Sequence, residues 1–182
     1  VRPFLDELQW MGFSVFAFDY SGYGTSEGKP TESGVYEDTL AAFDYMTNAL
    51  RIAPGNIIAH GRSVGAAMAI DLATKRPVGG LVVESGFVTA FRVKTVIPIA
   101  PFDRFRNIDK IARVKCPVLV FHGRNDDVVP FWHGEKLFEA APEPKRSAWI
   151  DEAGHNDLFW IAGGRYRTEL ESLASLVGSK LD

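Results

Sequence analysis

The sequence predicts an α/β fold in which a mostly parallel sheet is flanked by helices. Two observations lead to this prediction. Apolar runs of strand length alternate with segments of helical periodicity throughout the chain, which is typical of parallel sheets with helical connections. The chain has 182 residues, 46% of them hydrophobic and 13 of them phenylalanine, so it can bury one substantial core. We therefore expect a single domain over residues 1–182.

The first third of the chain predicts two helices with a strand between them. Residues 3–11 carry apolar side chains at helical spacing, and residues 13–20 (FSVFAFDY) have the composition of a buried strand. A glycine-rich loop over residues 21–30 follows. Either Thr31 or Ser33 then caps a helix whose apolar residues recur every three or four positions.

The remainder of the chain alternates further strands with helices. The expected strands are residues 56–60, 81–84, 117–122 and 147–151. The expected helices are residues 64–73, 132–140 and 165–177. Residues 85–115 are irregular and rich in Phe, Val, Ile and Pro, and we interpret them as a small cap excursion from the sheet.

The charge and cysteine content narrow the range of partners. The net charge is −3 and the pI is near 5.8, which argues against a nucleic acid as the main partner. No apolar run is long enough to span a bilayer, and no signal peptide is visible. The single cysteine, Cys116, favours a reducing compartment, so we expect a cytoplasmic protein. The oligomeric state is not predicted by the sequence.

The strongest chemical signal is the sequence GRSVG at residues 61–65. A predicted strand ends at this motif and a predicted helix begins after it, which is the setting of a nucleophile elbow. We expect Ser63 to adopt a strained backbone conformation, with Gly61 and Gly65 avoiding side-chain clashes in the tight turn. The turn would raise the serine hydroxyl above the carboxyl edge of the sheet. The alternative is a plain turn between a strand and a helix.

A serine hydroxyl becomes a strong nucleophile only when a histidine accepts its proton and a carboxylate holds that histidine. His155 lies in a loop after the last predicted strand, and it is the preferred base. The segment HGRNDDVVP offers Asp126 and Asp127, between which the spacing does not decide. Glu84, at the end of an earlier predicted strand, is a rival acid. We expect His122 to be a structural hydrogen-bonding residue and His133 to be solvated or to cap a helix.

Four ordered motifs carry a family resemblance: FDYSGYGTSEGKP, GRSVG, FRNIDKIARVKCPVLVFHGRNDDVVP and EAGHND. They resemble α/β-hydrolases of the branch that contains the eukaryotic protein depalmitoylases and their bacterial serine-hydrolase relatives. The resemblance runs from about residue 13 to residue 158. It implies an α/β-hydrolase fold, Ser63 as nucleophile, His155 as base, and Asp126 in preference to Asp127 as the acid.

The same resemblance implies earlier strands and a His-Gly loop that donates one N–H to an oxyanion hole. Nothing before Val1 supplies them, so we expect the sequence to be a fragment of a longer protein and to be poorly active by itself. Losing one such donor typically costs about 10²–10³ in rate. The other donor is expected to be the backbone N–H of Val64.

We predict a serine hydrolase that cleaves ester or thioester bonds of a small-molecule or acyl substrate through an acyl-enzyme intermediate. A pocket for the substrate is expected to involve Tyr23, Phe87, Phe91 and Ile97. Two alternatives stay open, namely a serine peptidase of aminopeptidase type and a non-catalytic binding module with the same fold. The histidines and the cysteine do not stand at metal-site spacings, so no metal or other cofactor is expected.

Overall fold

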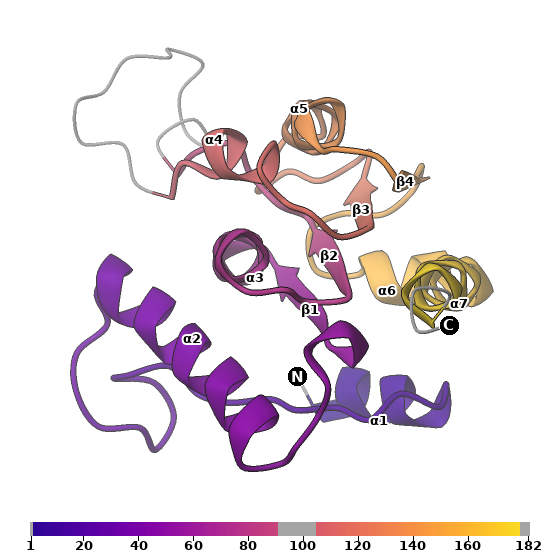
Figure 1. The fold of residues 1–182 in the computed structure, drawn as a ribbon. Helices are drawn as coiled ribbons and strands as arrows, with labels where there is room; N and C mark the ends of the chain where they lie inside the picture. Colours follow the sequence, from indigo (N-terminus) through magenta and orange to yellow (C-terminus); the bar gives the residue numbers. More distant parts are fainter. Residues whose placement is uncertain (1, 91–104, 179–182) are drawn as a thin grey trace.

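The computed structural model describes residues 2–90 and 105–178. Its centre is a four-stranded sheet in the order β1-β2-β3-β4, in which every neighbouring pair is parallel (Figure 1). The strands are β1 (Ile58–Arg62), β2 (Gly80–Glu84), β3 (Val118–Gly123) and β4 (Lys145–Ile150). Because all connections are crossovers that contain helices, the predicted fold class is confirmed.

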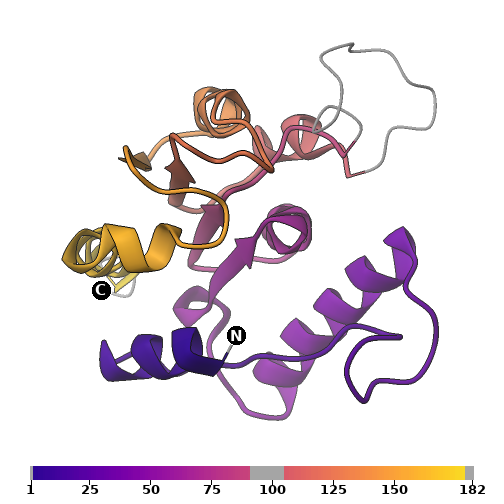
Figure 2. The same cartoon turned by 180° about the vertical axis from the view of Figure 1, so that it is seen from behind.

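Helices cover both faces of this sheet, as the two opposite views show (Figures 1 and 2). One face is covered by α3 (Val64–Lys75), α4 (Asn107–Ile111) and α5 (Trp132–Ala140), with α2 (Glu32–Asn48) packed outside α3. The other face is covered by α1 (Arg2–Trp10), α6 (Leu158–Ala162) and α7 (Gly164–Gly178). A short 3₁₀ turn, η1 (Pro54–Asn56), leads into β1.

The two central strands are buried along their whole length, which explains the apolar runs LVV in β2 and VLVF in β3. Successive side chains point to opposite faces, so Val83 and Val120 pack on the α3 side while Val82 and Phe121 pack on the α7 side. Each layer therefore has its own apolar core, and the sheet is held rigidly between them. This rigidity matters because the carboxyl ends of the strands carry the candidate site.

The helix α2 begins where the sequence allowed two caps. Thr31 is the residue that caps it, with its hydroxyl oxygen accepting a hydrogen bond from the N–H of Gly34 at 3.0 Å. The short helices α4 and α6 were not expected from the sequence. Each spans five residues, too few for a helical period to be recognised. None of the helices in the described part of the chain combines the length and apolar character needed to cross a bilayer.

The strand predicted at residues 13–20 is wrong. This segment forms no strand, and no ladder partner for it exists among the described residues. A strand is defined by hydrogen bonds to a neighbouring strand, and the composition of a segment does not supply that neighbour.

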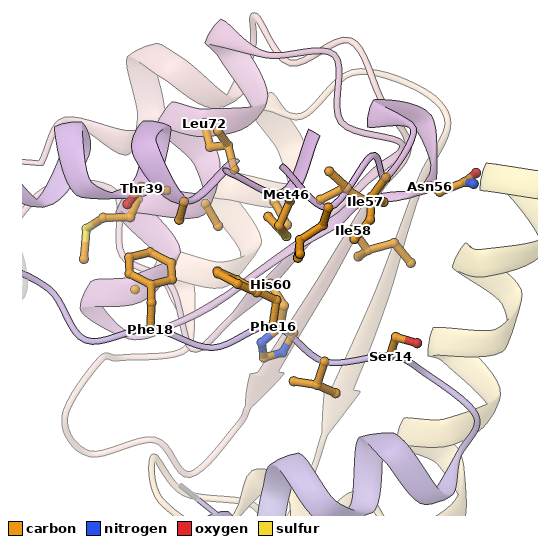
Figure 3. A pocket seen from close by; sticks show the side chains of 18 of the residues that line it. Ser14, Phe16, Phe18, Thr39, Met46, Asn56, Ile57, Ile58, His60 and Leu72 are labelled. Carbon is orange, nitrogen blue, oxygen red and sulfur yellow. The ribbon is translucent and has the colours of Figure 1, made fainter. Parts of the chain in front are cut away.

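A cavity of about 380 Å³ lies between residues 13–20, β1 and helices α2 and α3, bordered by Phe16, Phe18 and His60 (Figure 3).

The cap excursion predicted over residues 85–115 lies partly outside the described residues. The structure describes residues 85–90 and 105–115, the latter including α4. Two of the expected pocket residues, Phe91 and Ile97, fall in the undescribed range, so their predicted role stays a prediction.

Candidate active site

Ser63 lies at the turn between β1 and α3, where the sequence predicts an elbow. Its φ of 54° and ψ of −119° place a non-glycine residue in a sparsely populated conformation. At Gly61, an added Cβ would overlap the carbonyl of Gly65, so that position requires glycine. At Gly65, an added Cβ would meet no heavy atom within 4 Å. The expectation that both glycines avoid a clash is therefore right for Gly61 and wrong for Gly65.

The structure brings three of the predicted site residues into a line of hydrogen bonds. His155 Nε2 lies 3.0 Å from Ser63 Oγ, and His155 Nδ1 lies 2.8 Å from Asp126 Oδ2. A carboxylate can only accept, so Nδ1 carries the proton and Nε2 is left to accept the proton of the serine hydroxyl. This is the arrangement in which a histidine can act as a general base towards the serine.

The structure separates Asp126 from Asp127. Asp126 is buried, and its second oxygen accepts hydrogen bonds from the N–H groups of Val128 at 3.0 Å and Val129 at 2.7 Å. Asp127 is exposed. Burial alone would raise the pKa of Asp126, but the hydrogen bonds from His155 and Val129 and the charges of His155 and His122 outweigh burial and lower that pKa. The carboxylate is therefore ionised where it meets the imidazole.

Two other histidines have structural positions. His122 is fully buried, and its Nε2 donates to the carbonyl of Val129 at 2.8 Å, while burial lowers its pKa and keeps it neutral. This contact matches the structural role expected of it. His133 is also fully buried, with its Nδ1 accepting from the N–H of Val88 at 3.1 Å. The expectation of a solvated or capping His133 is wrong, because α5 packs this side chain into the core.

Glu84, the rival acid, is buried at the end of β2 and has other partners. It accepts a hydrogen bond from Tyr166 at 2.7 Å and lies 3.4 Å from His60 and 3.5 Å from Arg62. Burial would raise the pKa of Glu84, but its hydrogen bond and charge interaction with His60, helped by Tyr166 and Arg62, lower it overall. None of its described contacts involves His155.

A cavity of about 450 Å³ opens beside the residue that follows the nucleophile candidate. It is bordered by Tyr20, Tyr23, Val35, Val64, Met68 and Phe105, among others. Of the predicted pocket residues, Tyr23 lines it. Phe87, which is buried, does not line it. Val35, Met68 and Phe105 also border the cavity, and they were not predicted to do so, because the same side chains belong to or pack against an apolar core cluster.

The first backbone N–H groups of α3 lie at the turn that carries Ser63. A helix leaves its first four N–H groups without intrahelical acceptors, and Val64 is the first residue of α3. Its N–H is therefore available at the elbow. No cluster of three or more His, Cys, Asp or Glu side chains suited to a metal ion occurs within residues 2–90 and 105–178.

Comparison with known proteins identifies the family. The family model described as "Prolyl oligopeptidase family" matches residues 4–172, which is nearly the whole chain. The chain belongs to the prolyl oligopeptidase family. Members of the prolyl oligopeptidase family are α/β-hydrolases, so the resemblance found in the four motifs is confirmed.

Individual proteins similar to this member of the prolyl oligopeptidase family are also α/β-hydrolases, lipases or esterases by name. Alpha/beta hydrolase domain-containing protein 17B of Homo sapiens is 38% identical over 168 residues, covering 89% of this chain and 56% of its own length. The monoacylglycerol lipase of Paleococcus ferrophilus is 22% identical, with a TM-score of 0.73 over 96% of this chain and 88% of its own. An esterase of Pyrococcus furiosus is 18% identical, with a TM-score of 0.77 over 96% and 73%.

These figures also limit what is shared. The chain spans about half the length of the curated relatives that it matches, from 47% to 57% among the first eight. The two solved structures are less than 25% identical to this chain, so their similarity to it shows a common fold and no more.

Proposed function

We propose that this protein is a serine hydrolase that cleaves esters or thioesters of apolar acyl groups. The observation that supports the proposal best is the hydrogen-bonded line from Ser63 through His155 to Asp126, at 3.0 Å and 2.8 Å, built on a strained strand–helix turn. Such strain is retained only where the surrounding structure enforces it, and it is common at functional sites.

The reaction proposed for this site has two acyl-transfer steps. In the first, Ser63 Oγ bonds to the substrate carbonyl carbon while its proton passes to His155 Nε2, and His155 then gives that proton to the departing alcohol or thiol. In the second, a water molecule loses a proton to the same nitrogen and its oxygen bonds to the acyl carbon. The bond from that carbon to Ser63 Oγ then breaks, and His155 returns the proton to Oγ. Asp126 keeps the imidazole in the required tautomer and stabilises its positive charge.

The negative charge that develops on the carbonyl oxygen needs hydrogen-bond donors. The N–H of Val64 stands directly after the nucleophile and at the start of α3, where the helix dipole also favours an anion. We assign it as one oxyanion donor.

The acyl group is assigned to the cavity beside Val64. Its lining of Tyr20, Val35, Met68 and Phe105 is largely apolar, and a volume of about 450 Å³ suits an extended chain. The two proteins of similar fold, a monoacylglycerol lipase and an esterase, are in keeping with an ester substrate.

A fluorophosphonate probe read by intact mass tests this proposal directly. The parent protein is expected to gain one probe mass, and Ser63→Ala is expected to gain none. A series of p-nitrophenyl esters and acyl thioesters of rising chain length then tests the substrate class. A folded parent protein that stays unlabelled would contradict the proposal and favour the non-catalytic binding module.

A second candidate function is peptide-bond hydrolysis, because the matching family model carries a peptidase description. The same three residues would serve both reactions, so the substrate must decide. Aminoacyl and dipeptidyl anilides should be assayed beside the esters. Faster turnover of an anilide than of any ester would replace the ester proposal with the peptidase.

A further inference from the structure

Arg62, the residue before the nucleophile candidate, is paired with Glu84 across the sheet. The two are register partners at the carboxyl ends of β1 and β2, and Arg62 Nε lies 3.5 Å from Glu84 Oε1. The Glu84 side chain is almost completely buried, so its charge must be compensated. The Arg62 guanidinium is therefore held beside Glu84 at the carboxyl edge of the sheet.

The Glu84 carboxylate is itself fixed from the opposite layer. Its Oε2 accepts a hydrogen bond from Tyr166 Oη at 2.7 Å and lies 3.4 Å from His60 Nε2. Tyr166, on α7, stacks on Phe121 with ring centroids 4.2 Å apart. Arg62 thus rests against an anion that both the sheet and a helix hold in position.

The far end of the guanidinium reaches the loop of the base candidate. Arg62 Nη2 donates to the backbone carbonyl of His155 at 2.7 Å and to Asn156 Oδ1 at 2.8 Å. A guanidinium is planar, and its donors form a rigid fork, so its contacts at the two ends fix one another's geometry. One side chain therefore joins the edge of the sheet to the loop that carries His155.

Two consecutive residues, Arg62 and Ser63, contact the two ends of His155, its backbone carbonyl and its imidazole. Arg62 therefore adds a backbone contact to the two side-chain contacts of the imidazole, those with Ser63 and Asp126. A displacement of about 1 Å in a reacting group can cost on the order of 10²-fold in rate.

We propose that Arg62 is a positioning residue, which ties the His155 loop to the buried Glu84 and so holds the imidazole against the serine. The inference rests on the proposed function, because positioning matters to rate only if His155 is the base. It adds a residue outside the Ser63, Asp126 and His155 set.

The decisive variant is Arg62→Lys. A lysine keeps a positive charge beside Glu84, so the fold is retained, but its single ammonium cannot maintain contact with Glu84 and both loop acceptors. We expect kcat to fall about 10- to 100-fold with KM within about twofold and the melting temperature little changed. Asn156→Ala, which removes one acceptor, should lower kcat less. Arg167→Gln is the control, since Arg167 is about as exposed as Arg62, 45% against 42%, and among the described residues it pairs with Glu171 on α7 and lies over the Trp10 ring of α1.

Amide hydrogen exchange of the same variants gives a readout that needs no activity. Faster exchange confined to residues 151–158 in Arg62→Lys supports the tether, and unchanged exchange there overturns it. A kcat equal to that of the parent, or a loss of kcat accompanied by faster exchange across the whole sheet, also overturns it. If the parent is unreactive towards the probe but exchange in the loop rises selectively, the proposed function fails and the tether stands.

Discussion

Asp126 Oδ2 lies 2.8 Å from His155 Nδ1, while the other oxygen of the same carboxylate is held by two backbone N–H groups. The Asp126 carboxylate is thus held by backbone groups of its own loop as well as by the histidine. This relationship is the basis of the first two predictions.

Replacing Asp126 by asparagine should abolish most activity while keeping the shape of the site. An amide can donate to Nδ1, which selects the wrong imidazole tautomer, and such a change typically lowers kcat about 10⁴-fold. Asp127→Asn is the matched control, because the neighbouring side chain is exposed, and it should stay near the parent. Equal losses in the two variants, measured by ester turnover, would show that the choice of Asp126 is mistaken.

The lowered pKa of Asp126 predicts how stability depends on pH. A carboxyl group whose pKa is lower in the folded state than in the unfolded state, where it is about 3.9, stabilises the protein above the unfolded value. This contribution disappears as the pH falls through the folded value. Urea unfolding should therefore show the parent losing its advantage over Asp126→Asn below about pH 4. A difference that stays constant from neutral pH to pH 3 would contradict the lowered pKa.

The two glycines of the elbow should respond differently to alanine. Gly61→Ala places a methyl group against the carbonyl of Gly65, and overpacking of this kind costs about 1–3 kcal/mol of unfolding free energy. Gly65→Ala meets open space and should stay within about 0.5 kcal/mol of the parent. Denaturant titration of both variants measures the difference. Similar losses in both would mean that the turn is not constrained as described.

Tyr23 should influence the preference for acyl-chain length. It lines the cavity beside Val64, and truncation to alanine removes apolar contact with a long chain, for which we expect a loss of roughly tenfold in kcat/KM. Turnover of an acetyl ester should hardly change. Tyr45→Ala is the control, because its side chain is equally exposed, 53% against 54%, and does not line this cavity. A uniform loss over all chain lengths would place the acyl group elsewhere.

The elements that could be predicted from the sequence are those whose signal is local. The buried strands β2 and β3 contain the apolar runs LVV and VLVF, and the turn at Ser63 is a short motif between a strand and a helix. Candidate residues for the site, Ser63 and His155, also follow from their places after predicted strands, because the carboxyl ends of parallel strands meet at one edge.

Pairing and burial are not local, and here the sequence was insufficient. Residues 13–20 have the composition of a strand, but they form no ladder with any described strand. His133 stands at the start of a helix, where exposure is usual, yet the packing of α5 buries it completely. The composition of a segment does not predict which other segments will lie next to it in the fold.

By itself, the sequence determined the fold class, the order of the chemical motifs and the position of the elbow, because periodicity and turn chemistry act over a few residues. Only the tertiary structure distinguished Asp126 from Asp127 by contact, and only it showed the link from Glu84 through Arg62 to the His155 loop. These contacts join residues up to 93 positions apart. Their geometry depends on how the layers pack around the sheet, which no local pattern in the chain records.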